Sequence, residues 1–248
     1  MNAMYLLWLR QVKRYYRAKS RIVGAIGQPV LYLLALGYGL GAVFKRAGQG
    51  DYLQFLVPGV IAQTILFSAI FWGIQIIFDR QFGFLKEMLV APVSRLKIMV
   101  GGALGGATIA VFQGLLVFVM SLAVGFRPHN WAALPLALLV MAILGVALSS
   151  FGSGLGSIVN DMQGFQAINN FIVFPLYFLS GALYPLNDIP AILKFIAAID
   201  PLTYAIDGLR AILINEHHYP LGTDILALSL TTVGCIIFGV VTFRRIQS

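Results

Sequence analysis

Long apolar windows without Asp, Glu, Lys or Arg recur along the chain, separated by short polar connections. Each window can cross a hydrocarbon core of roughly 30 Å as a helix, and in lipid only a helix satisfies its backbone hydrogen bonds within one segment. We therefore predict an all-α integral membrane protein with six spans in a single transmembrane domain over residues 1–248. The predicted spans are 22–44, 52–78, 98–126, 131–158, 164–185 and 224–243.

The composition is that of a membrane protein. Of the 248 residues, 59% are hydrophobic and 10% are charged, whereas a soluble domain carries roughly 25% charged residues. Six spans and their connections leave no room for a separate soluble catalytic domain.

The distribution of cations predicts the orientation in the membrane. Twelve of the 17 Lys and Arg residues fall on the face that carries both termini, and five fall on the opposite face. Positive charge collects on the cytoplasmic side of membrane proteins. We expect both termini in the cytoplasm and the chain in the plasma membrane, the inner membrane of a prokaryote. The same bias explains the net charge of +8 without a nucleic-acid partner.

Residues 4–21 are amphipathic at helical spacing, with aromatic and aliphatic side chains opposite a sector of cations. The pattern predicts a helix in the membrane interface, facing anionic lipid or a cytoplasmic partner. A plain topology anchor is the alternative. The cations are Arg10, Lys13, Arg14, Arg17 and Arg21.

The external segment 187–216 is apolar, but Pro190 and Pro201 divide it into pieces too short to span. We predict two short helices that dip back toward the membrane as a re-entrant hairpin. Asn187 or Asp188 can cap the first helix.

The second of these helices has a clearer start. Asp200 followed by Pro201 is typical of a cap with proline in the first turn. Asp207 and Arg210, three residues apart, are expected to pair on its surface.

The sequence lacks the residues that several kinds of membrane protein need for their chemistry. No ionisable group is expected deep in a span, which argues against an ion-coupled transporter. No span offers a histidine to activate a nucleophile, no metal-ligand cluster occurs, and no Gly-Lys dipeptide marks a phosphate-binding loop. Uphill transport would need energy from another subunit, so we expect neither an enzyme nor a bound cofactor.

Neutral polar side chains and paired glycines occur inside the windows. The polar groups, among them Gln28, Gln63 and Gln113, either bond across helices or line a substrate path. The glycine pairs predict close helix packing, with a dimer seam as the alternative. The pairs are Gly37 with Gly41, Gly101 with Gly105, and Gly102 with Gly106.

The connection after the second span, residues 79–91, has apolar side chains at helical spacing, and Pro92 disfavours helix beyond it. Such a segment suits a helix-in-groove contact with a partner, although an interfacial turn is the alternative. It resembles the first cytoplasmic connection of the permease subunits of ABC-2-type exporters, D-R-E-x-G-T-L-E-x-L-L-V-T-P-V-S-R. The matching residues are Asp79, Arg80, Gly83, Leu85, Leu89, Val90, Pro92, Val93, Ser94 and Arg95.

A second stretch resembles the same family. Residues 175–185, Pro190 and 200–204, followed by Asp207 and Arg210, are similar to P-L-x-F-L-S-G-x-x-x-P-L…P…N-P-L-T-Y…D…R. Asp200 stands where the family has asparagine.

The resemblance implies a partner ATPase that alone binds Mg-ATP, and a second permease copy, with a homodimer favoured over a heterodimer. It also implies a coupling helix seated on the ATPase, ATPase contact by the N-terminal helix, and an external gate. The coupling residues would be Asp79, Arg80, Phe82, Gly83, Leu85, Lys86, Glu87, Leu89 and Pro92. The gate residues would be Ser180, Gly181, Pro185, Pro190, Pro201, Tyr204, Asp207 and Arg210.

The cargo stays open. The short external segments resemble drug, antibiotic-resistance or lipid exporters, and polysaccharide exporters are the runner-up. An ATP-independent channel or scramblase is the alternative from another class.

Overall fold

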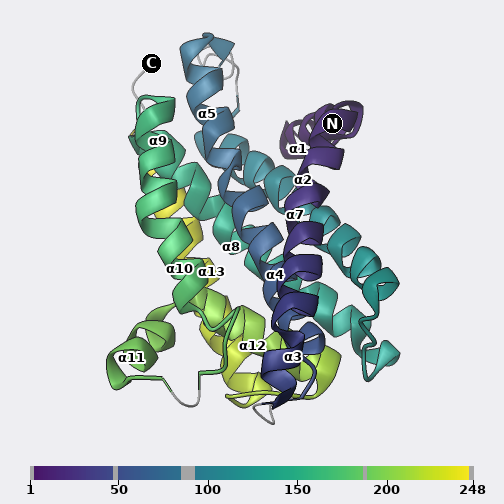
Figure 1. Cartoon of the computed structure of the whole chain (residues 1–248). Helices are drawn as coiled ribbons and strands as arrows, with labels where there is room; N and C mark the ends of the chain where they lie inside the picture. The colour runs from purple at the N-terminus through teal and green to yellow at the C-terminus, as the bar shows by residue number, and fades with distance from the viewer. Residues whose placement is uncertain (1–2, 47–49, 85–92, 187–188, 246–248) are drawn as a thin grey trace.

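The computed structural model describes residues 3–46, 50–84, 93–186 and 189–245. All regular secondary structure in this part of the chain is helical, without a strand, which confirms the all-α prediction (Figure 1). In chain order its helices are α1 (Ala3–Arg17), α2 (Lys19–Tyr32), the π-helix η1 (Leu33–Tyr38), α3 (Gly39–Arg46), α4 (Tyr52–Ile70), α5 (Trp72–Gln81), α7 (Arg95–Val124), the 3-10 turn η2 (Trp131–Ala133), α8 (Leu134–Ile158), α9 (Met162–Ile168), the π-helix η3 (Asn169–Val173), α10 (Phe174–Leu179), α11 (Ala191–Ile199), α12 (Pro201–Ile214) and α13 (Leu221–Arg244).

Five helical stretches of the described chain are long and apolar enough to cross a membrane, and they confirm a multi-pass protein. They are Ile22–Arg46, Tyr52–Gln81, Arg95–Val124, Trp131–Ile158 and Leu221–Arg244. The remaining predicted span, 164–185, falls on α9, η3 and α10, which form one helix from Met162 to Leu179. That helix is not among the five, so a sixth crossing stays a prediction.

The second predicted span forms the centre of the bundle. Helix α4 packs against α7, α8 and α12, and its Leu56, Ile61 and Ile65 are fully buried. Burial all round explains why this helix is apolar on every face.

Glycines let α5 and α8 approach at backbone distance. A side chain at Gly73 would collide with the carbonyl oxygen of Gly152, and one at Gly156 would collide with that of Gly73. Contacts this close are possible only without Cβ atoms, and they fix α5 against α8.

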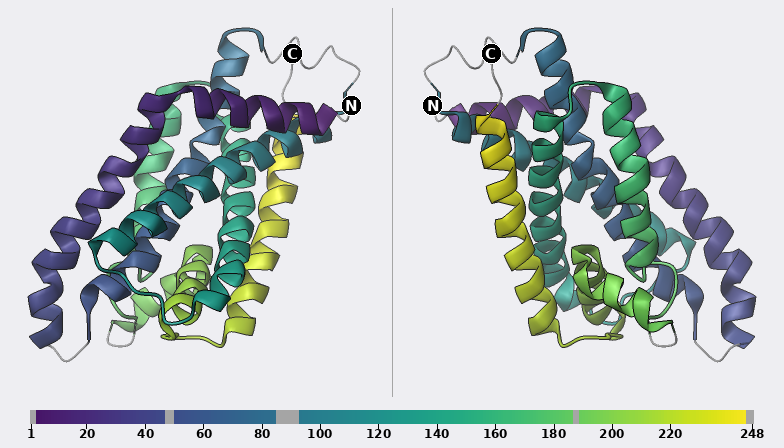
Figure 2. Two further views of the ribbon diagram at one scale, coloured as in Figure 1. Left: turned by 90° about the vertical axis from the view of Figure 1, so that its right-hand side faces the viewer. Right: turned by 90° about the vertical axis from the view of Figure 1, so that its left-hand side faces the viewer.

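Helix α1 lies across one end of the bundle, roughly perpendicular to the spans, and both termini lie at this end (Figure 2). The predicted N-terminal helix is thus present, but it ends at Arg17 rather than at residue 21. The chain turns at Ala18, and Arg21 belongs to α2. We call this end of the bundle the terminal end.

Helices α11 and α12 lie at the opposite end of the bundle (Figure 2), as the proline pattern predicts. Asp200 caps α12, accepting a hydrogen bond from the Leu202 amide at 2.9 Å, with Pro201 in the first turn. The predicted cap of the first helix is wrong, because Pro190 occupies the cap position of α11. Asn187 and Asp188 lie outside the described residues.

Candidate functional site

Asp79 lies in the last turn of α5 at the terminal end, where it joins two segments far apart in sequence. Its carboxylate is 3.7 Å from the Arg10 guanidinium of α1 and accepts a hydrogen bond from Gln75 at 2.7 Å. Asp79 is buried, whereas the Arg10 side chain is 46% exposed. The ion pair therefore ties α1 to the last turn of α5.

Arg80, the next residue, fastens the same turn to the end of α8. Its Nη2 donates to the carbonyl oxygens of Gly156 at 2.6 Å and Val159 at 2.7 Å, and its Nη1 donates to Asn160 Oδ1 at 2.9 Å. The last carbonyls of a helix lack partners within the helix and carry partial negative charge. An arginine here satisfies them and fixes the position at which the connection leaves α5.

The structure places the first four predicted coupling residues and not the rest. Asp79 and Arg80 belong to α5, which continues past the predicted end of the span at residue 78 to Gln81. Phe82 is 68% exposed, and Gly83 adopts a left-handed φ of 80°, which glycine accepts without strain. The other five coupling residues, Leu85, Lys86, Glu87, Leu89 and Pro92, lie outside the described residues.

The packed face of α1 is buried against a glycine face of α7. Gly101 and Gly105 contact Met4, Leu7 and Gln11, which confirms this pair as a packing face. On the outer side of α1, Lys13, Arg14 and Arg17 are exposed. The cations predicted to face lipid or a partner are therefore available for such a contact.

The other two glycine pairs differ in whether both members pack within the chain. Gly102 and Gly106 pack on the Trp72 ring, and Gly37 packs on Leu53. Gly41 has no neighbour within 4 Å of its would-be Cβ atom, so only one member of its pair packs within the chain.

At the opposite end of the bundle, the buried side chain of Arg210 in α12 contacts several backbone segments. Its Nη2 donates to the carbonyl oxygens of Gly181 at 2.9 Å and Ala182 at 3.1 Å, and its Nε donates to that of Phe55 at 3.3 Å. The guanidinium carbon lies 3.6 Å from the centre of the Phe55 ring, a cation–π distance. Burial lowers the pKa of Arg210 to about 10, which leaves the side chain charged at neutral pH.

Asp207 and Arg210 do not pair as predicted, and the described residues show no ion pair between them. Asp207 instead accepts hydrogen bonds from the backbone amides of His218 at 2.8 Å and Tyr219 at 2.7 Å. The two charges point to different backbone segments. Arg210 holds the turn after α10, and Asp207 holds the connection between α12 and α13.

Other predicted gate residues surround this arrangement. Ser180 bonds to the Tyr177 carbonyl, and the Tyr204 hydroxyl bonds to that of Ala198 at 2.6 Å. Ser180, Pro185, Asp207 and Arg210 line a hollow of about 450 Å³. Gly181 has φ of 76° and ends the turn after α10, and Pro190 and Pro201 start α11 and α12.

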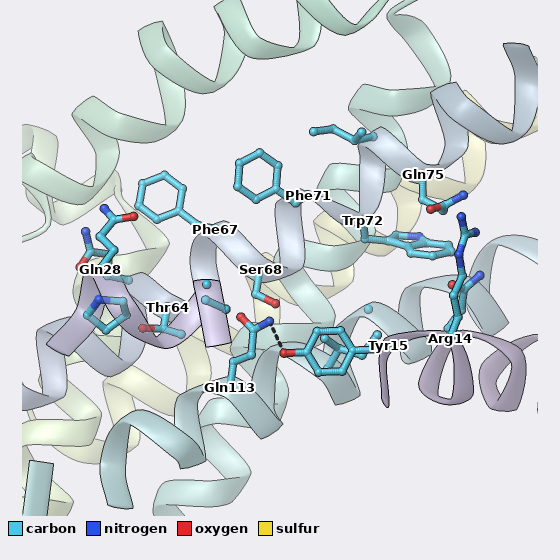
Figure 3. Close-up of a pocket in the computed structure, with 18 of the residues that line it drawn as sticks. Arg14, Tyr15, Gln28, Thr64, Phe67, Ser68, Phe71, Trp72, Gln75 and Gln113 are labelled. Atoms are coloured by element: carbon cyan, nitrogen blue, oxygen red, sulfur yellow. Dashed lines mark hydrogen bonds between the residues drawn. The ribbon is translucent and has the colours of Figure 1, made fainter. Parts of the chain in front are cut away.

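A larger groove of about 550 Å³ lies between α2 and the α4–α5 pair, with α1 and α7 closing its floor. Phe67, Phe71 and Trp72 stand along one wall (Figure 3). On the floor Gln113 donates to the Tyr15 hydroxyl at 2.7 Å. Arg14 lies at one end of the groove beside Gln75, and Gln28 lies at the other (Figure 3). Several neutral polar residues of the apolar windows thus meet in one place.

Comparison with known proteins identifies the family. The sequence model described as ABC-2 type transporter matches residues 2–214. The chain belongs to this family.

Named relatives agree with this assignment. Nodulation protein J of Rhizobium leguminosarum bv. viciae is 32% identical over 218 residues, covering 85% of this chain and 83% of the relative. The inner membrane transport permease YadH of Escherichia coli K12 is 27% identical and covers 98% of this chain and 92% of its own length. The putative transport permease ycf38 of Cyanophora paradoxa is 27% identical over 85% of this chain and 73% of its own length. The chain is an ABC-2 family transport permease.

Sequence reasoning missed some polar anchors of this permease. The partners of Arg80 lie 76 and 79 residues away, and no local pattern connects them. Asp224 is buried in the first turn of α13 with both carboxylate oxygens unpartnered. An acid in the first turn after the Pro220 helix start is the one signal that could have drawn attention to it.

Proposed function

We propose that this permease is the transmembrane subunit of an ATP-driven exporter, and that a separate ATPase subunit binds Mg-ATP and drives it. Two permease copies would enclose the path for an amphipathic cargo. The observation that carries this proposal is the junction at the terminal end. There Arg10 of α1 pairs with Asp79 in the last turn of α5, next to the connection that is predicted to face the ATPase.

A junction of this kind suits force transmission. An ATPase that moves the connection after α5 would pull directly on α1 through Asp79 and on the end of α8 through Arg80. Because α5 and α8 touch at backbone level around Gly73, the three segments would move as one body. Interfaces packed this tightly transmit a displacement rather than absorb it.

The opposite end supports a gate. Helix α11 presents Ile192, Phe195 and Ile199, each at least 65% exposed, as an apolar face that suits shallow burial in the outer membrane interface. Arg210 links the turn after α10, through the carbonyl groups of Gly181 and Ala182, to the carbonyl group of Phe55 in α4. In this proposal the terminal end is cytoplasmic, α9–α10 supplies the sixth crossing, and α11–α12 dips back from outside.

The proposal is tested by transport in proteoliposomes. The permease is purified from its native membranes after mild cross-linking, and any co-purifying ATPase is reconstituted with it. Substrate flux that requires Mg-ATP is the expected result. Flux without ATP, from permease that binds no ATPase, would instead establish a passive channel or scramblase.

A further inference from the structure

Asp200 forms the corner of the external hairpin, where α11 ends and α12 begins. Its backbone N–H donates to the carbonyl oxygens of Ile196 at 3.1 Å and Ala197 at 3.2 Å and so caps the end of α11. Its carboxylate Oδ1 accepts the Leu202 amide and so caps the start of α12. Helix α11 projects sideways from the bundle (Figure 1), and Ala197 is its one buried residue. The position of α11 therefore depends on this corner.

The second carboxylate oxygen of Asp200 has no hydrogen-bond partner among the described residues. Asp200 is 2% exposed, and its Oδ2 atom is buried and unpartnered. An ionised carboxylate in such a place is costly. The hydroxyl of Thr203, three residues along the chain, is also buried without a partner in the described structure. Side chains at the cap and at the third helical position lie next to each other, so one turn holds two unsatisfied groups.

Among the described residues, no cation balances the charge of Asp200. Burial raises the pKa of its carboxyl group to about 7, and the Leu202 amide alone opposes this shift. Helices α4, α8, α11 and α13 and the turn η2 pack on α12, but their titratable groups do not act on Asp200. At this end of the bundle, the titratable groups of α12 and of these elements are Tyr52, Lys194, Tyr204, Asp207, Arg210 and Asp224.

A proton is the neutralising group that this corner accepts. The buried cation of this end, Arg210, donates to backbone carbonyl groups instead. Within the described ranges, no group of three or more His, Cys, Asp or Glu side chains could hold a metal ion. Protonation removes the buried charge without any further ligand, and protons are supplied by the medium.

Protonation also changes the hydrogen bonds that the corner can make. An ionised carboxylate only accepts, whereas a protonated carboxyl group donates one hydrogen bond and still accepts at its other oxygen. Oδ1 can thus keep the Leu202 amide while the proton on Oδ2 offers a donor to an acceptor such as the Thr203 hydroxyl. The asparagine of the similar family motif presents one acceptor and one donor at every pH. Asp200 presents the same pair only while it holds a proton.

We propose that Asp200 is a proton-operated switch of the external hairpin. With the proton bound, the corner stays packed and fixes α11 relative to α12. Without it, the buried charge draws water into the corner, and the hairpin loosens. The role of this hairpin as a gate on the outer side rests on the proposed function, whereas the titration of Asp200 does not.

The direction of the switch follows from the two states of the hairpin. In the loosened hairpin Asp200 meets water and has its ordinary pKa of about 4, whereas in the packed corner its pKa is about 7. The packed state therefore has its full advantage below about pH 4. It loses up to about tenfold of this advantage per pH unit as the pH rises to about 7.

Infrared spectroscopy detects the proton directly, because a protonated carboxyl group and a carboxylate absorb at different frequencies. The permease is reconstituted without ATPase. The unmodified chain should show a carboxyl band at about pH 5 that disappears at about pH 9, and Asp200→Asn should lack this band. Other acids contribute to both spectra alike, so the difference between the two proteins isolates Asp200. Identical spectra would overturn the proposal.

Hydrogen–deuterium exchange of residues 191–214 shows whether loss of the proton loosens the hairpin. Rates are normalised to an unstructured peptide at the same pH, because intrinsic exchange itself depends on pH. Between about pH 5 and about pH 8, normalised exchange in the unmodified chain should rise about tenfold or more. In Asp200→Asn it should stay constant.

Two further variants control this measurement. Glu216→Gln removes the same charge from an exposed acid at the same end and should behave like the unmodified chain. Asp200→Ser can cap a helix but cannot ionise, so it should behave like Asp200→Asn. Equal pH dependence in Asp200→Asn and the unmodified chain, or failure of both Asp200 variants to fold, would overturn the proposal. Both measurements need neither ATPase nor cargo, so a lack of ATP-driven transport would contradict the proposed function alone.

Discussion

The first two predicted spans carry the same sequence signal but have opposite surroundings. In the arm Ile22–Arg46, 17% of the most apolar window is buried within the chain, against 72% in the central helix Tyr52–Gln81. The arm's Val23, Leu31 and Tyr38 are at least 61% exposed. Apolar side chains in a membrane protein are satisfied by lipid, cargo or another subunit as well as by a core. The difference shows that most of the arm's apolar surface lies outside the packed core of the chain, whereas the central helix lies within it.

The surroundings of individual glycines show the same difference between the arm and the central helix. Those of the central helix meet backbone atoms, as Gly59 does with the Ala182 carbonyl, whereas Gly24, Gly27, Gly39 and Gly41 of the arm have open space around them. A glycine at a close approach is a packing requirement, and a glycine in open space is only a source of flexibility.

The largest expected effect comes from Gly73→Ala. The added methyl group would collide with the Gly152 carbonyl and the Phe165 ring, and such overpacking costs about 3 kcal/mol. The free energy of unfolding in mixed detergent–SDS micelles measures it. Gly41→Ala in the arm is the matched control and should stabilise slightly, because alanine favours helix over glycine by about 1 kcal/mol. Equal losses in both variants would mean that the arm is as tightly packed as the core.

Arg210→Met comes next. It leaves the carbonyls of Phe55, Gly181 and Ala182 without their donor in a buried place, which should cost about 2 kcal/mol. Arg127→Met is the control, because Arg127 also bonds to two carbonyls but is exposed, so water can replace it. Melting temperatures in detergent compare the two. Equal shifts would refute the role of burial at the α4–α12 contact.

Asp200→Asn tests the pH dependence of the same end. Burial raises the pKa of Asp200 to about 7, so between about pH 4 and 7 the folded state holds a proton that the unfolded state releases. Stability should therefore fall as pH rises through this window, by up to about 1.4 kcal/mol per pH unit. Asparagine can still cap α12.

In Asp200→Asn, stability should depend less on pH, and the variant should be more stable than the unmodified chain at pH 8. The melting temperature of both proteins, recorded against pH, measures this. Parallel curves for the two proteins would show that Asp200 titrates normally in the folded state.

The smallest effect is expected from Tyr38→Phe, which removes a hydrogen bond from the arm to the Val124 carbonyl at 2.7 Å. Tyr38 is 61% exposed, so the loss should be about 0.5 kcal/mol. Tyr16→Phe, at a more exposed tyrosine of α1, is the reference and should show no change. A loss for Tyr38→Phe as large as that of Arg210→Met would contradict the loose attachment of the arm.

The sequence predicted the helices better than the contacts between them. Apolar windows located five helices that can span a membrane, and the Asp200–Pro201 pair located the start of α12, because both signals are local. The partners of Arg80 and Arg210 are carbonyl groups of distant segments, and every residue offers the same carbonyl. For that reason helical spacing suggested the nearby Asp207 instead. The sequence showed only that polar residues occur within the apolar windows. The groove that they line depends on the distance between α2 and α4, which no local pattern predicts.

The central claim is that an ATPase seats on the terminal end. The direct measurement is the Mg-dependent ATPase activity that co-purifies with permease variants from native membranes. Phe82→Asp, which replaces a 68% exposed ring beside Gly83, should reduce this activity by a factor of about ten or more. Trp131→Asp, at a 56% exposed ring on the opposite end, should keep it. Undiminished activity with Phe82→Asp, or none with the unmodified chain, would contradict the account.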